Sequence, residues 1–426
     1  MNNINRKIQP GTHLIDKFTF PQPELIRLDN GIPVYQLNTG TQDITKIEFL
    51  FSAGGWFEEK ALVAKFTNKM LKEGTRSYSS AEIHETTDFY GAHLEASSDK
   101  DMAYVALYSL NKHLNHLLPV LKEVILEPVF PEKELLTRIQ NKKQEFLINC
   151  EKVKYIARLK FNELIFGKSH PYGRFIEVND FDQLTHQDLS EFHKSHYHIN
   201  QCKIILAGKI PADLPLLLNK YFGSHKGEAP VINNKRAHIE LMEQHQIHIK
   251  KDKAIQSAIR IGKVLVNKTH PDYLKLKVVN TILGGYFGSR LMTTIREEKG
   301  YTYGIGSGIT SMQHAGSFFI SSEVGADVTN DAIADIYNEI KILQEEMVPD
   351  KELDLVRNYM LGSLLRSMDG PFALSESLKS LVEYGLDVNY FRNFIHTIKN
   401  ITPEEIRALA QQYFEQETLF ELKVGK

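Results

Sequence analysis

Hydrophobic and polar residues follow the same two periods in both halves of the chain. Residues 46–54 and 103–110 alternate like half-buried strands, and residues 61–74 between them carry an apolar stripe, Leu62, Phe66 and Met70, at helical spacing. The order strand, helix, strand returns in the second half at residues 257–266, 272–283 and 316–324. The pattern predicts an α+β fold, with a largely antiparallel sheet and helices packed on one side of it. A doubly wound parallel sheet fits less well, because no glycine-rich phosphate turn follows a predicted strand.

Two pairs of similar segments lie about half a chain length apart. PEKELLTRIQNKKQEFL at 131–147 resembles PDKELDLVRNYMLGSLL at 349–365, and LTHQDLSEFHKSHY at 184–197 resembles ITPEEIRALAQQYF at 401–414. Matched pairs at nearly one offset indicate an internal repeat. We therefore expect two similarly built domains, residues 1–230 and 231–426, with a linker near residues 225–240.

Composition narrows the class of protein. The chain has 426 residues, 42% of them hydrophobic, and a net charge of −2, so it can bury substantial cores but offers no basic field for nucleic acid or an anionic membrane. Its two cysteines have no metal or redox spacing. No secretory signal or membrane span is visible, which favours the cytoplasm; a chain from which a leader had been removed would look the same and would then be periplasmic.

The order of several motifs resembles that of the insulinase or pitrilysin family of zinc peptidases, in its short two-domain branch. The motifs extend over nearly the whole chain: SAGGWFEE, a helix ending in MLKEGT, YGAHLEASSDKDMAYVAL, PVFPEKELLTRIQNKKQEF, HPYGR and LGGYFGSRLMTTIREEKGYTYGIGSG. The resemblance implies an H-x-x-E-H motif on the first helix, whose two histidines bind zinc and whose glutamate activates water.

At the corresponding positions this chain has Lys65, Asn68 and Lys69. An ammonium group must lose a proton before it can bind a metal, and with a reference pKa of about 10.4 this costs roughly 4–5 kcal/mol per lysine at neutral pH. Two such costs would remove most of the roughly 10–16 kcal/mol of a good structural zinc site. Asparagine cannot act as the general base. We therefore predict no metal on this chain.

The resemblance places the third zinc ligand, a glutamate, near Glu145. Glu145 also follows Lys142 by three residues and lies off the apolar stripe Leu135, Leu136, Ile139 and Phe146, so we favour a surface ion pair. The histidine clusters at 193–198 and 245–248 are alternative metal sites, but neither has an obvious carboxylate base beside it. The two lysines also have an alternative interpretation: Lys65 and Lys69 would be ordinary surface residues on the solvated face of a helix.

In the second half, Arg296 and Tyr303 have the seven-residue spacing of an arginine and a tyrosine that reach the substrate in the family. The resemblance implies that the tyrosine donates a hydrogen bond to the oxyanion and that the arginine holds a peptide carbonyl or carboxylate. A structural interpretation also exists, because Tyr301 and Tyr303 alternate along a probable strand and Arg296 has acidic neighbours.

Together these features predict a zinc-free subunit that completes the site of a homologous, zinc-binding partner in a heterodimeric metalloendopeptidase. The substrate would be an extended peptide paired with the sheet edge at Glu95, Ala96, Ser97 and Ser98, where the family usually has Asn-Ala-x-Thr. Two alternatives remain: a scaffolding protein without a role in proteolysis, and an autonomous peptidase with an unfamiliar metal site.

Overall fold

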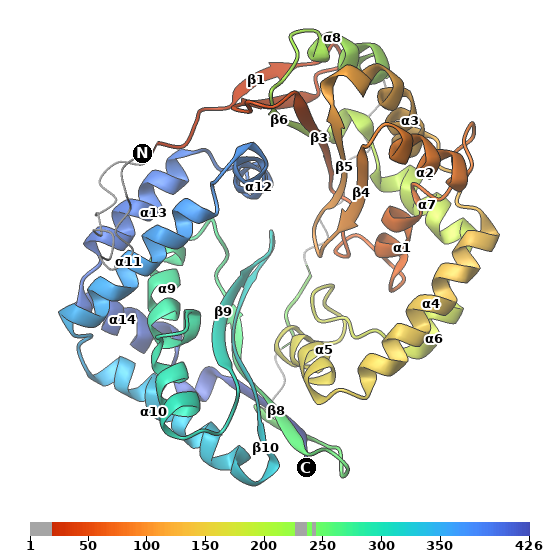
Figure 1. Cartoon of the computed structure of the whole chain (residues 1–426). Coiled ribbons are helices and arrows are strands. Elements are labelled where there is room, and N and C mark those ends of the chain that lie inside the picture. The colour runs from red at the N-terminus through yellow and green to blue at the C-terminus, as the bar shows by residue number, and fades with distance from the viewer. Residues whose placement is uncertain (1–18, 226–236, 241–243) are drawn as a thin grey trace, which may run out of the picture.

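Two β-sheets, one in each half of the chain, face each other in the structure (Figure 1). The computed structural model describes residues 19–225, 237–240 and 244–426. The expected linker lies mostly outside the described residues. Both sheets are largely antiparallel with helices on their outer faces, so the predicted α+β class is confirmed.

The first sheet has six strands in the order β1-β2-β6-β3-β5-β4. Only β2 and β6 are parallel; all the other neighbours are antiparallel. Strand β4 lies at one edge of this sheet. The strands are β1 (Glu24–Arg27), β2 (Pro33–Asn38), β3 (Ile44–Phe51), β4 (His93–Ser98), β5 (Ala103–Leu110) and β6 (Lys203–Gly208).

The second sheet has five strands in the order β7-β11-β8-β10-β9, with β7 and β11 parallel and the remaining neighbours antiparallel. The two longest strands of this sheet, β8 and β10, pair antiparallel along their whole length. The strands are β7 (Gln246–Lys250), β8 (Gln256–Leu265), β9 (Ile305–Ser311), β10 (Gly316–Gly325) and β11 (Phe420–Gly425).

Helices cover the outer face of each sheet: α1, α2, α3 and α7 lie outside the first, and α9, α10, α11, α13 and α14 lie outside the second (Figure 1). The first half contains α1 (Val63–Met70), α2 (Ser80–Phe89), α3 (Leu114–Leu126), α4 (Glu132–Cys150), α5 (Val153–Phe166), α6 (Val178–Asp182), α7 (His186–His196) and α8 (Leu214–Leu218). The second half contains α9 (Tyr273–Asn280), α10 (Thr329–Glu345), α11 (Asp350–Arg366), α12 (Pro371–Val382), α13 (Asn389–Asn400) and α14 (Pro403–Tyr413).

The repeated segments form equivalent helices. The first pair of segments becomes α4 and α11, each beginning directly after a proline, and the second pair becomes α7 and α14. Thr185 and Thr402 start the latter two helices with the same capping box, in which the threonine hydroxyl and an acidic side chain three residues later each bind a backbone N–H of the other. The sequence repeat is therefore a structural repeat.

The two halves exchange one helix each. Helix α5 of the first half packs against β8 and β11 of the second sheet, and α12 of the second half packs against β2 and β6 of the first sheet. The two helices follow α4 and α11 directly, so they occupy equivalent places in the repeat. Because of this exchange, the inner face of each sheet is covered in part by the other half.

The exchange changes the burial of β3. Alternation predicted a strand with one solvated face, but every residue from Thr45 to Phe51 is buried, including the charged Lys46 and Glu48. The reason is α12, which covers the inner face: Glu376 and Lys379 of α12 complete an ion-pair network with these two residues.

A second polar contact between the halves involves two carboxyl groups at one hydroxyl. The Tyr104 hydroxyl lies 2.8 Å from Asp99 Oδ2 and 2.8 Å from Glu383 Oε1. A hydroxyl has one proton to donate, so one of the two contacts needs a proton on the carboxyl group. Burial, together with the Asp99 carboxylate, raises the pKa of Glu383 to about 7.

We therefore expect the free energy of unfolding to fall as pH rises from about 4.5, the ordinary pKa of a glutamate, to about 7. Over this range the folded chain holds a proton on Glu383 that the unfolded chain has lost. Glu383→Gln should flatten this part of the profile, measured by urea unfolding between pH 5 and 8, whereas the exposed Glu417→Gln should leave it unchanged. An equally steep profile in Glu383→Gln would contradict the assignment.

Candidate functional site

Helix α1 carries the three altered motif positions, two of ligands and one of the general base, in three different environments. Lys65 is exposed, Asn68 is fully buried and Lys69 is half-buried. The Asn68 amide donates to the carbonyl oxygen of Tyr104 at 3.2 Å, which ties the helix to β5. The predicted stripe of Leu62, Phe66 and Met70 is buried, although the helix itself is shorter than the pattern indicated.

Lys69 bonds to the edge of the first sheet. Its ammonium group donates a hydrogen bond to the carbonyl oxygen of Ala96 in β4, and burial lowers the pKa of Lys69, against the opposing effect of Glu95. A lysine at the second histidine position is therefore used to hold helix and strand together. It does not extend into solvent like an ordinary surface lysine.

Glu145 lies exposed on α4 and pairs with Lys142 at 2.6 Å, as expected for a surface ion pair. Its hydrogen bond to Lys142 lowers the pKa of Glu145, with a smaller effect from Lys65. Within the stretches that the structure describes, no three histidine, cysteine, aspartate or glutamate side chains come close enough to hold a metal. Zinc does not fit here, because two of the three ligand positions carry the ammonium groups of Lys65 and Lys69. The carboxylate at the third position, Glu145, is paired with another lysine.

Leu136, which we assigned to the buried stripe of α4, is 53% exposed, whereas Leu135, Ile139 and Phe146 are buried. The helix buries a narrower face than its sequence suggested.

In the histidine cluster of α7, His193 contacts the carbonyl oxygen of Ile125 at 2.8 Å, and burial lowers the pKa of His193 to about 4. His248 contacts the carbonyl oxygen of Gly425 at 3.2 Å. A ring nitrogen of each of these two histidines therefore already contacts a backbone carbonyl oxygen.

The predicted peptide-binding segment, Glu95 to Ser98, belongs to the edge strand β4. Glu95 is exposed, Ala96 is buried, and Ser97 and Ser98 are half-buried. An edge strand offers backbone groups to an added strand. One of its acceptors, the Ala96 carbonyl oxygen, is already bonded to Lys69.

Tyr303 is 95% exposed, an unusual state for a large aromatic side chain. The predicted strand is wrong at this point: β9 begins only at Ile305, and Tyr303 lies in the preceding loop. The cause is Thr302, whose hydroxyl donates to the Glu323 carbonyl oxygen at 2.7 Å and accepts from the Gly304 N–H at 3.1 Å, so that a turn replaces the ladder. Tyr301 packs against the hydrophobic core instead.

Arg296 lies in a π-helical segment, Met292–Glu298, and its guanidinium group lies over the ring of Phe287, 4.6 Å from the ring centroid. The expected pairing with an acidic neighbour is weak, since Glu297 is 3.9 Å away. A ring beneath one face of the guanidinium leaves its N–H donors free at the edges. Neither Arg296 nor Tyr303 is therefore committed to the packing of the second half.

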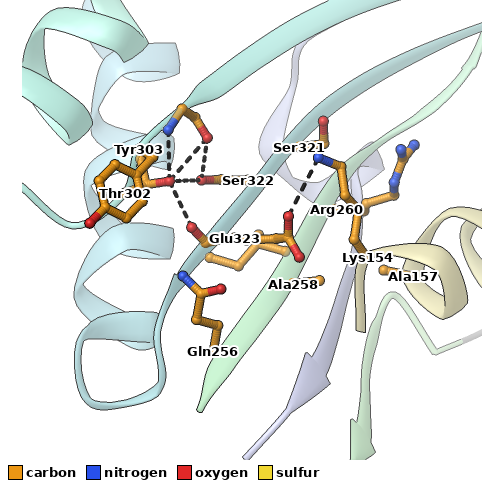
Figure 2. Close-up of a pocket in the computed structure, with 12 residues that line it drawn as sticks. Lys154, Ala157, Gln256, Ala258, Arg260, Thr302, Tyr303, Ser321, Ser322 and Glu323 are labelled. Atoms are coloured by element: carbon orange, nitrogen blue, oxygen red, sulfur yellow. Dashed lines mark hydrogen bonds and ion pairs between the residues drawn. The ribbon is translucent and has the colours of Figure 1, made fainter. Parts of the chain in front are cut away.

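Tyr303 lies beside a pocket of about 320 Å³ formed by α5, β8, β10 and the loop before β9 (Figure 2). Figure 2 shows Arg260 on the opposite side of the pocket from Tyr303, with the ion pair of Lys154 and Glu323, 3.4 Å, between them. Sequence reasoning missed Lys154 and Arg260. The first comes from the exchanged helix α5 and the second from β8, and no local motif joins them.

The fold and the altered helix together define a metallopeptidase-like protein without the metal-binding motif. Residues 34–157 match the family model described as "Insulinase (Peptidase family M16)", and residues 183–360 match "Peptidase M16 inactive domain". The two matches cover more than half of the chain, so the chain belongs to the insulinase family, peptidase family M16.

Curated relatives are distant but match over most of their length. The chain is 24% identical to "Uncharacterized zinc protease YmxG" of Bacillus subtilis (91% of this chain, 95% of the relative). It is 22% identical to "Non-peptidase homolog YmxG" of Helicobacter pylori (87% and 86%) and 21% identical to "Probable inactive metalloprotease YmfF" of B. subtilis (79% and 83%).

Solved structures share the fold. A "peptidase M16 inactive domain" from Pseudomonas fluorescens has a TM-score of 0.83 at 23% identity, covering 95% of this chain and 98% of its own. A protease from H. pylori has a TM-score of 0.85 at 16% identity (96% and 100%). A chain of Complex III2 from Candida albicans has a TM-score of 0.75 at 13% identity (94% and 95%).

Proposed function

We propose that this chain is the zinc-free subunit of a heterodimeric insulinase-family metalloendopeptidase. It would contribute Arg296 and Tyr303 to the active site of a homologous, zinc-binding subunit. The observation that carries the proposal is the contrast between the halves: the first carries lysines at the family's two histidine positions, while the second presents an almost fully exposed phenol and a guanidinium group stacked on a ring. The names of two relatives, non-peptidase homolog and probable inactive metalloprotease, support the same assignment.

Each side chain has a chemical role that needs no metal on this chain. The Tyr303 hydroxyl can donate a hydrogen bond to the oxyanion that develops when a peptide carbonyl is attacked. The planar fork of Arg296 suits a peptide carbonyl or carboxylate. Zinc and the activated water belong to the partner. An extended peptide is expected to pair with the edge strand β4 next to Glu95. It would use backbone groups other than the Ala96 carbonyl oxygen, which is bonded to Lys69.

The alternative is a structural member of the family without a role in proteolysis. The proposal places both subunits in one compartment, which we expect to be the cytoplasm. Within the part of the chain that the structure describes, no helix is long and apolar enough to cross a membrane.

Co-expression with the homologue of the same organism that carries an intact H-x-x-E-H motif tests the proposal. We expect a stable pair with one zinc per heterodimer and chelator-sensitive peptide cleavage, and no stoichiometric zinc in the isolated chain. Replacing the partner's motif glutamate with glutamine should abolish cleavage, because that residue supplies the general base. Stoichiometric zinc together with cleavage by the isolated chain would overturn the proposal.

A further inference from the structure

A second cavity, of about 260 Å³, lies where α5 of the first half packs on the second sheet. Three cationic side chains from three separate segments line it: Lys100, Arg158 of α5 and Arg260 of β8. Half of its other lining residues are aromatic, including Phe161 and Phe319, and polar side chains such as Ser317 complete the wall. We call it the junction pocket. Arg260 also lines the pocket beside Tyr303, so the two cavities are neighbours.

Two of the three cations of the junction pocket, Arg158 and Arg260, have no bonded counter-ion in the described part of the chain, whereas Glu58 and Asp101 attract the third, Lys100. Among the described residues, neither Arg158 nor Arg260 forms an ion pair or a side-chain hydrogen bond; Arg260 lies over the rings of Phe161 and Phe319, at 5.9 and 5.0 Å from their centroids. Burial and the charge of Arg158 lower the pKa of Arg260 to about 10. Arg158 is exposed and Arg260 is half-buried, and both line the same cavity. Two like charges that share a cavity without a bonded carboxylate favour an anion between them.

Another arginine of the chain shows the usual arrangement of a buried guanidinium. Arg290 donates two hydrogen bonds to Glu352, at 2.9 Å each, and this pairing raises the pKa of Arg290. The pKa of Arg260 is lowered instead, because no carboxylate is bonded to this guanidinium group to offset its burial. The junction pocket therefore has the donors of a bidentate carboxylate site but lacks the carboxylate.

We propose that the junction pocket binds a carboxylate of a peptide, with Arg260 and Arg158 as the donors and the aromatic wall holding the side chain next to it. Aromatic rings on the wall favour a peptide carboxylate with an apolar neighbour over inorganic phosphate, which would leave that surface unused. The peptide assignment deepens the proposed function, and rests on it, because Arg260 lies opposite Tyr303 in the adjoining pocket. The anion site itself does not depend on a zinc-binding partner.

Peptide binding to the full chain alone tests this site separately from proteolysis. Trp56, the single tryptophan, lies with its ring 4.8 Å from that of Tyr172, which lines the junction pocket, so its fluorescence reports binding. Short peptides ending in phenylalanine, with either a free or an amidated C-terminus, and inorganic phosphate serve as probes. We expect the free carboxylate to bind at least about tenfold more tightly than the amide, since charge-assisted hydrogen bonds are lost in the amide.

Arg260→Met keeps a side chain of similar length and should abolish the preference for the free carboxylate, whereas Lys160→Met, which removes a cation paired with Glu163 on α5 and lines neither pocket, should keep it. Arg260→Met should also have an unchanged or higher melting temperature, because the substitution removes a half-buried charge that has no bonded counter-ion among the described residues. Equal binding of acid and amide would overturn the site, as would a preference that survives in Arg260→Met. Phosphate binding without peptide binding would overturn the peptide assignment. If the peptides bind as expected but no active pair forms, only the proposed function fails.

Discussion

Replacing Tyr303 with phenylalanine is expected to lower peptide cleavage by the assembled pair about a hundredfold or more, mainly in kcat. The substitution removes one hydroxyl and keeps the ring, and loss of one well-placed oxyanion donor has an effect of this size. Tyr303 is almost fully exposed, so the folded chain should be unaffected. The measurement is kcat and KM for the purified heterodimer with a fluorogenic peptide.

Tyr301→Phe is the matched control, because Tyr301 is two residues away and packs against the core. It should leave kcat unchanged. Arg296→Ala should mainly raise KM and leave kcat nearly unchanged, since a residue that holds the substrate equally in the ground state and the transition state contributes uniform binding. If Tyr303→Phe cleaves peptide as fast as the original pair, the scaffolding alternative replaces the proposed function.

Replacing Glu48 with alanine is expected to destabilise the chain by about 3–5 kcal/mol, the usual result of breaking a buried ion pair from one side. Glu48 accepts hydrogen bonds from Lys46 at 2.7 Å and from Lys379 at 2.9 Å. Its loss leaves two ammonium groups with only Glu376, which is half-exposed. Because the network joins β3 to α12, the two halves should separate more easily. Urea unfolding at neutral pH measures the change.

Glu145→Ala removes a glutamate from an exposed ion pair with Lys142 and should cost less than about 1 kcal/mol. The double substitution Lys46→Met and Glu48→Met should recover part of the loss, since removing both partners leaves fewer uncompensated charges. A change of less than about 1 kcal/mol in Glu48→Ala would show that solvent reaches the network and that the exchange of helices leaves it hydrated.

Local patterns predicted much of the secondary structure. Strand β5 covers the predicted residues 103–110, and the repeated segments form α4 with α11 and α7 with α14. These predictions succeeded because side-chain period and capping are properties of neighbouring residues. The prediction failed at Tyr303, where the Thr302 hydroxyl takes the backbone contacts that a longer strand would have used.

In the candidate site, too, local features could be predicted from the sequence and contacts between distant segments could not. Lys65, Asn68 and Lys69 stand out because the motif that they replace is local, and Arg296 and Tyr303 stand out because their spacing is fixed. The bond between Lys69 and Ala96 and the meeting of Arg158 with Arg260 are invisible in the sequence. In both cases the two residues come from elements far apart along the chain.

The sequence by itself determined the periods of helices and strands, the internal repeat and the loss of metal donors, because each depends on residue type and spacing along one segment. Only the tertiary structure decided the exchange of α5 and α12, the burial of Lys46 and Glu48, and the shared cavity of Arg158 and Arg260. The physical reason is that burial and charge pairing depend on which surfaces meet. In this chain the surfaces that meet belong to opposite halves of the repeat.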